Sequence, residues 1–98
     1  MICITADGHK LDLEESFDHG KEGEIYLCGN SAIKVYKKEE RTPIMEKKLK
    51  WMVQNPPHWQ VRKLVAWPQE LVYSESGEFL GFRMRRIKSK TTLAVILS

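Results

Sequence analysis

Two glycines and a lysine form the part of this sequence that is best suited to chemistry. Gly20 and Gly23 lie close together, and Lys34 follows eleven residues after the second glycine. Glycine lets backbone amides approach a phosphate because no side chain stands in the way. A lysine supplies a compact positive charge that attracts phosphates. Residues of these types are able to contact a phosphate, and a plain hairpin turn beside a solvated lysine is the alternative.

Short predicted strands surround these residues. Residues 17–28 are expected to form a strand, a turn that contains both glycines, and a second strand, and a third strand is expected at 31–36. In a dinucleotide-binding fingerprint the glycine turn leads from a strand into a helix, so these glycines do not fit it. Side chains alternate along a strand, and Ala32 and Lys34 are therefore expected on one face, opposite Ile33 and Val35.

One main helix is predicted from about Pro43 to Gln54. Thr42 is a good N-cap residue, and proline suits the first helical position because its missing amide hydrogen is not needed there. Apolar residues then recur at helical spacing and form one stripe: Met45, Leu49, Met52 and Val53. The helix ends at Asn55-Pro56-Pro57, because proline cannot continue its hydrogen bonds.

Hairpins account for the rest of the predicted fold. Alternating apolar residues on either side of Asp7-Gly8 predict an N-terminal hairpin with positive φ at both turn positions. Two further strands are expected at 65–73 and 79–84, and Pro68 marks a strand start or an edge because it cannot donate to a ladder. We therefore expect an α+β fold, with a twisted antiparallel sheet of about five strands, an extra N-terminal hairpin and one main helix.

The order of these elements, with Ala32-Ile33-Lys34 on the third strand, resembles the small N-terminal lobe of a protein-kinase-like domain. In that family a glycine-rich loop covers ATP, a strand lysine holds the phosphates, and a glutamate on the next helix pairs with the lysine. Further motifs resemble a poorly characterised bacterial subgroup: Asn55-Pro56-Pro57, Ala66-Trp67-Pro68 and Gly81-Phe82. The resemblance covers residues 1–92, and we expect 93–98 to be the truncated start of a following helix.

The resemblance implies a nucleotide-binding role for one set of residues. Ile25 would lie on the adenine, Ala32 would leave room for the base, and Met84 would guard the back of the pocket. The full implied set is Gly20, Gly23, Ile25, Ala32, Lys34 and Met84. Asp18 stands where the family has its first glycine, and an acid at that position repels phosphate.

Glu46 is the residue that the resemblance implies as the helix partner of Lys34. It lies on the flank of the apolar stripe, where a side chain can face a cleft beside the packed face. Lys50 is four residues further on, so an ordinary helix pair between Glu46 and Lys50 is the alternative. Glu39 and Glu40 are rival partners for the lysine.

The catalytic aspartates of the family are absent from this sequence, because it contains neither a His-Arg-Asp type motif nor Asp-Phe-Gly. We therefore expect no catalytic residue in this chain and no phosphoryl transfer by it alone, whether the parent protein is a kinase or a pseudokinase. ATP with Mg is the expected ligand. It would bind weakly, or only together with the missing C-terminal lobe, because half of the pocket is absent and Lys34 would be open to water. No metal-ligand spacing is present among the histidines and cysteines.

Composition limits the location and the partners. The chain has 98 residues, a net charge of +3 and no apolar run of membrane-spanning length, so we expect one small globular domain and no membrane insertion. The two cysteines are far apart in the sequence, which favours a reducing cytoplasm. Expected partners are the missing lobe or another protein, and a homodimer through an exposed apolar face is a further option.

Two other functions remain open. A free-standing adaptor on the same fold would bind a protein partner through its tail and apolar face. A nucleic-acid module would combine the basic residues at 83–90 with the three tryptophans Trp51, Trp59 and Trp67. The tryptophans fall in apolar patterns typical of a core, so the nucleic-acid hypothesis is the weakest, and the basic residues also fit a solvated edge.

Overall fold

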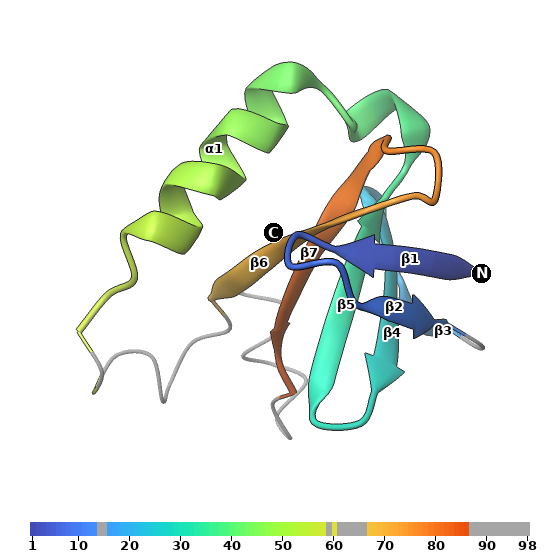
Figure 1. The fold of residues 1–98 in the computed structure, drawn as a ribbon, viewed down its shortest axis with the longest axis horizontal. Coiled ribbons are helices and arrows are strands. Elements are labelled where there is room, and N and C mark those ends of the chain that lie inside the picture. The colour runs from blue at the N-terminus through green and yellow to red at the C-terminus, as the bar shows by residue number, and fades with distance from the viewer. Residues whose placement is uncertain (14–15, 59, 61–66, 87–98) are drawn as a thin grey trace.

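The chain folds as one antiparallel sheet with the helix α1 packed on it (Figure 1). The computed structural model describes residues 1–13, 16–58, 60 and 67–86. The elements in chain order are β1 (Ile2–Thr5), β2 (Lys10–Asp12), β3 (Ser16–His19), β4 (Gly23–Cys28), β5 (Ser31–Tyr36), the 3-10 helix η1 (Lys38–Glu40), α1 (Pro43–Gln54), β6 (Pro68–Tyr73) and β7 (Phe79–Arg85).

The sheet has seven strands in the order β2-β1-β6-β7-β5-β4-β3, and every neighbouring pair is antiparallel. Strands β3 to β7 form the five-stranded part, and the N-terminal hairpin of β1 and β2 extends the sheet beyond β6. The predicted α+β class, with about five strands, an extra hairpin and one main helix, is confirmed.

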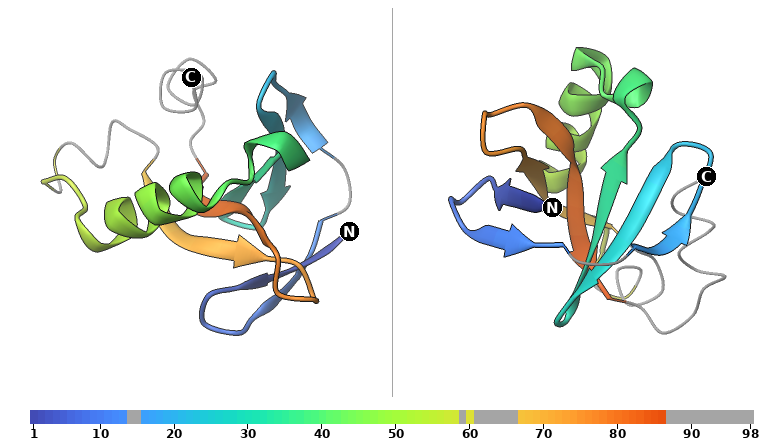
Figure 2. Two further views of the ribbon diagram at one scale, coloured as in Figure 1. Left: turned by 90° about the horizontal axis from the view of Figure 1, so that it is seen from above. Right: turned by 90° about the vertical axis from the view of Figure 1, so that its right-hand side faces the viewer.

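The two faces of the sheet carry separate apolar clusters, because successive side chains of a strand point to opposite faces. On one face lies the helix-side cluster: Ile25, Ala32, Tyr36, Leu49, Leu71, Phe79, Phe82 and Met84. On the other lies the back cluster: Cys3, Leu13, Ile33, Val35, Val72 and Leu80. The back cluster joins residues from the N-terminal segment to residues of β5, so the sheet curls over on itself. Figure 2 shows α1 and the β1–β2 hairpin on opposite sides of β6 and β7.

Local signals set the bounds of α1, which are those predicted. The Thr42 hydroxyl accepts a hydrogen bond from the Met45 amide at 3.1 Å, and Pro43 occupies the first turn. The helix buries Leu49 against the sheet, and the Trp67 indole donates to the Met52 carbonyl at 2.7 Å. This last bond ties the end of the helix to the residue just before β6. Pro68 begins β6, as expected, while residues 65 and 66 of the predicted strand lie outside the described residues.

The first hairpin turn differs from its prediction in one respect. Gly8 has φ of +95°, but none of the described residues other than glycine has positive φ, so Asp7 does not. A side-chain network closes the turn instead. The Thr5 hydroxyl donates to the Asp7 carboxylate, and His9 Nδ1 lies 2.9 Å from Asp7 Oδ1. The hydrogen bonds from Thr5 and His9 lower the pKa of Asp7 to about 2, and the contact with Asp7 raises the pKa of His9.

We predict that Asp7→Asn returns the pKa of His9 towards its ordinary value of about 6.5. Because the pKa of His9 is raised, its interaction with Asp7 stabilises the fold at a pH below the ordinary pKa of histidine. This stabilisation is lost as the pH rises through the pKa of His9 in the folded protein. The lowered pKa of Asp7 acts in the opposite direction, and that contribution is lost as pH falls towards about 2. An NMR titration of the His9 ring measures the shift. Asp12→Asn, on the neighbouring strand, is the control and should leave the ring unchanged.

Candidate functional site

The candidate site is built from two rows of side chains that run across β4, β5 and β7. In the first row, Ile25 is paired with Lys34, and Lys34 is paired with Phe82. In the second row, Leu27 is paired with Ala32, and Ala32 with Met84. Residues directly opposite each other in an antiparallel sheet share a face. The structure therefore brings Ile25, Ala32, Lys34 and Met84, all predicted from the sequence, onto one face.

These apolar side chains are already buried. Ile25 is 7% exposed, and Ala32 and Met84 are fully covered, as members of the helix-side cluster. A base can contact them only if the side chains packed over them move. Met84 therefore has the position of a core residue.

The ammonium group of Lys34 is buried beside the glycine loop. The residue is only 3% exposed, which contradicts our expectation that this lysine would be open to water. Its Nζ lies 5.7 Å from the centre of the Tyr36 ring, a distance at which a cation is attracted to the face of an aromatic ring. A Cβ atom built on Gly20 would lie 3.9 Å from the same Nζ. The turn at Gly20 and the lysine predicted to hold phosphates are therefore adjacent.

The glycine loop is held closely to the end of β5. The Gly20 amide donates to the Gly23 carbonyl at 2.8 Å, and the Lys37 amide donates to the Glu22 carbonyl at 2.7 Å. The two glycines serve different purposes. A Cβ on Gly23 would lie 2.1 Å from the Val35 carbonyl oxygen, so close strand pairing requires glycine there. A Cβ on Gly20 would meet nothing closer than 3.5 Å, and the residue is exposed.

Acidic side chains lie near the same end of β5. Burial raises the pKa of Tyr36 to about 12, and the negative charges of Glu22 and Glu40 add to this effect. Glu22 belongs to the glycine loop itself, so its carboxylate opposes any phosphate that approaches Lys34. The site thus combines a buried cation with nearby negative charges, which would oppose the approach of a phosphate.

Glu46 contacts residues other than Lys34. The Tyr73 hydroxyl donates to Glu46 Oε2 at 3.0 Å, and Lys50 Nζ lies 3.4 Å from the same oxygen. Burial, followed by the bond to Glu46, raises the pKa of Tyr73 to about 12. The ordinary helix pair with Lys50, considered above as the alternative, is therefore present. Among the ion pairs of the described residues, none joins Glu46 to Lys34.

Arg83 does not belong to a solvated basic edge. Its Nε donates to Glu70 at 2.7 Å. The guanidinium nitrogen Nη1 donates to Gln69 at 2.8 Å and to Ser31 at 3.3 Å. The side chain of Arg83, on β7, is therefore hydrogen-bonded to both neighbouring strands, β5 and β6. Trp51 is 60% exposed, which contradicts our assignment of this tryptophan to the core. Trp59 and two residues of the basic segment 83–90, Lys88 and Lys90, lie outside the described residues.

Two residues at the site were missed by the sequence analysis. Tyr36 lies two positions after Lys34 on β5, so strand alternation could have placed its ring on the same face. Gly81 of β7 allows a close approach of strands, because a Cβ there would lie 1.7 Å from the Lys34 carbonyl oxygen. Gly81 lies inside the predicted strand at 79–84, and a glycine within a strand is a signal of close backbone approach that could have found it.

Comparison with known proteins adds no relative to this geometry. The chain matches no family model, no curated protein and no solved structure. Over the described ranges, no three side chains of His, Cys, Asp or Glu are placed to hold a metal ion together. None of the helices in the same ranges is both long and apolar enough to cross a bilayer.

We predict that alanine destabilises the fold at Gly23 and Gly81 but not at Gly20. Gly23→Ala and Gly81→Ala should each lower the free energy of unfolding by about 1–3 kcal/mol or more, because the new Cβ overlaps backbone atoms of β5. Gly20→Ala should change it by less than about 0.5 kcal/mol, because the position has room and no positive φ. Urea unfolding measures all three. Equal losses at Gly20 and Gly23 would contradict this account of the loop.

Proposed function

We propose that this chain is the N-terminal nucleotide-binding lobe of a larger protein-kinase-like protein, either a kinase or a pseudokinase, and that it is not catalytic on its own. The observation that carries the proposal is the buried ammonium of Lys34 beside Gly20, on the same sheet face as Ile25, Ala32 and Met84. A lysine on a plain solvated strand face would be exposed.

The residues present fit ATP with Mg in part. Gly20 provides a surface that a side chain would fill, and Lys34 provides a cation 3.9 Å from that position. These two residues would hold the phosphates, and Ile25 and Ala32 would lie beside the base once the side chains packed over them move. Glu22 weakens the attraction, so the isolated chain would bind nucleotide only weakly. When bound, Mg would supply charge neutralisation between the phosphate oxygens.

Glu46 would take the role of helix partner only after a rearrangement, because its carboxylate now accepts from Tyr73 and pairs with Lys50. We propose that the missing C-terminal lobe, or another partner protein, favours that change. We place the protein in the cytoplasm, since both cysteines of the chain are free thiols.

Equilibrium dialysis with Mg-ATP tests the proposal. We expect a Kd of about 1 mM for the wild-type chain. Lys34→Met removes the ammonium and keeps an apolar side chain of similar length, so binding should become undetectable. Gly20→Ala should weaken binding without unfolding the chain. Lys37→Met, at an exposed position on the same segment, is the matched control and should bind like the wild type.

Equal binding by the wild type and by folded Lys34→Met would show that the nucleotide site is elsewhere. Absence of binding by the wild type at concentrations of about 10 mM, well above the expected Kd, would also overturn the proposal. Circular dichroism of each variant separates a lost site from a lost fold.

We also predict that the chain transfers no phosphate from ATP to a generic protein substrate. Phosphoryl transfer depends on positioned metal ions and a residue that orients the nucleophile, and the sequence lacks both aspartate motifs that supply them. Incorporation of labelled γ-phosphate should equal that of a blank without protein. Transfer above the blank that disappears in Lys34→Ala would contradict the prediction.

A further inference from the structure

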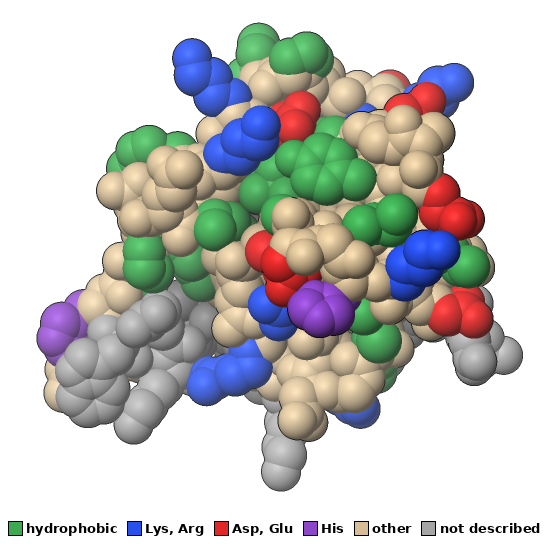
Figure 3. Space-filling view, in the orientation of Figure 1, with side chains coloured by type: hydrophobic (Ala, Val, Ile, Leu, Met, Phe, Trp, Pro, Cys, Tyr) green, Lys and Arg blue, Asp and Glu red, His purple; other side chains and the backbone are tan. Residues whose placement is uncertain are grey.

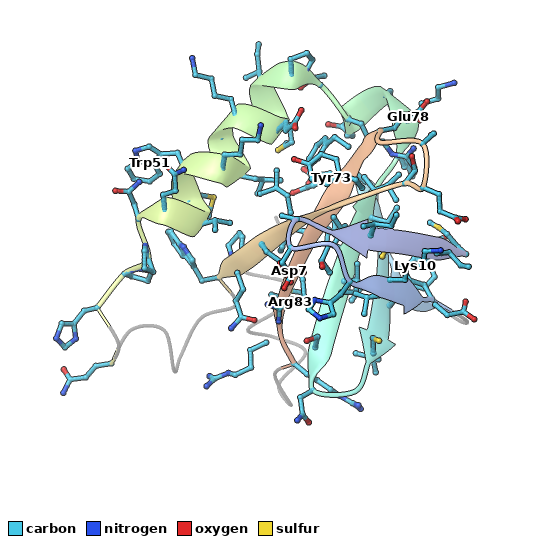
Figure 4. All side chains as sticks on the ribbon, viewed as in Figure 1. Asp7, Lys10, Trp51, Tyr73, Glu78 and Arg83 are labelled. Carbon is cyan, nitrogen blue, oxygen red and sulfur yellow. The ribbon has the colours of Figure 1, made fainter. Side chains whose placement is uncertain are left out.

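The outer face of α1 carries two large apolar side chains that are mostly exposed. Ile44 is 81% exposed and Trp51 is 60% exposed. They are seven residues apart, close to two helical turns, so they lie on one side of α1 about 10 Å from each other. The opposite side of the helix packs against the sheet through Leu49. Figure 4 shows Trp51 projecting from α1 away from the strands.

Lysines accompany these two side chains. At 100° per residue, Lys47 and Lys48 fall on the same side of the helix, between Ile44 and Trp51, and both are exposed. Lys50 is nearby and 58% exposed, although Glu46 lies 3.4 Å from its ammonium group. In Figure 3, basic side chains lie over α1 beside apolar ones. The outer face of α1 is therefore both apolar and positively charged.

We propose that the outer face of α1 binds an acidic segment of a partner protein that also carries apolar side chains. Acidic groups of the partner would match Lys47 and Lys48, and its apolar groups would cover Ile44 and Trp51. Tryptophan is among the residues that contribute most to protein interfaces, because a large apolar body is combined with a polar N–H. Opposite charges across the interface would set the orientation of the segment and speed its association.

Other occupants fit this surface less well. Two copies of the chain meeting through this face about a twofold axis would bring the same lysines together, because such an interface is self-complementary. A lipid surface binds helices with a long continuous apolar face, whereas this face has only Ile44 and Trp51. A nucleic acid would use the lysines and Trp51 but would leave Ile44 without a contact of suitable chemistry.

The test is a selection of random displayed peptides on the wild-type chain, followed by binding measurements with one synthesised peptide. We expect the enriched peptides to be rich in Asp or Glu together with aromatic or aliphatic residues. Trp51→Ala, and separately Lys47→Glu with Lys48→Glu, should weaken binding of the peptide by at least about tenfold. Lys10→Glu with Lys21→Glu makes the same charge change at exposed positions away from α1 and is the control that should bind normally.

Several results would overturn this proposal. These are failure to enrich any peptide, enrichment of peptides without acidic residues, or binding that Trp51→Ala leaves unchanged. Trp51-dependent binding of phosphatidylserine vesicles or of single-stranded DNA, without peptide binding, would assign the face to another ligand. A dimer that Trp51→Ala dissociates would assign it to a second copy. Lys34→Met should keep full peptide binding, so failure of the nucleotide proposal and failure of this one are distinguishable.

Discussion

The burial of a positive charge in the middle of the sheet is the constraint on which the site depends. Lys34 lies between Ile25 and Phe82 in one cross-strand row and is only 3% exposed. Moving an ammonium group out of water is costly unless other groups stabilise its charge. The Tyr36 ring contributes to that stabilisation from 5.7 Å. A phosphate at the Gly20 turn would add a full opposite charge close to the ammonium.

Close approach of the strands keeps this lysine in place. Gly23 and Gly81 pair with Tyr36 and Val35 of β5, and both lack the Cβ that would push β4 and β7 away from it. Arg83 adds polar bonds from β7 to β5 and β6. A small domain buries a limited apolar area and is only marginally stable, so the loss of any of these contacts matters. The outer face of α1 takes no part in these contacts between strands, so a partner could bind it without disturbing them.

Much of the local structure was predictable from the sequence. Thr42, Pro43 and Asn55 set the ends of α1, and the turn at Gly29 sets the start of β5, because these signals act within a few residues. Alternation also placed Ala32 and Lys34 on one face. The hairpin pairs followed from their turns, but the pairing of β1 with β6 and of β5 with β7 was not predictable, since it joins residues far apart in the chain. The contact between Glu46 and Tyr73 spans 27 residues and joins α1 to β6, and the burial of Lys34 depends on the pairing of β5 with β7.

The most direct test of the central claim is to map where ATP phosphates lie on the chain. Mn²⁺ bound to ATP broadens the NMR signals of nearby amides, and the effect falls steeply with distance. Our account predicts that the amides of the loop from Gly20 to Gly23 and of Lys34 broaden first, while those of the outer face of α1 remain sharp. Broadening centred on Lys47 and Lys48, or spread evenly over the surface, would contradict a nucleotide site at Lys34.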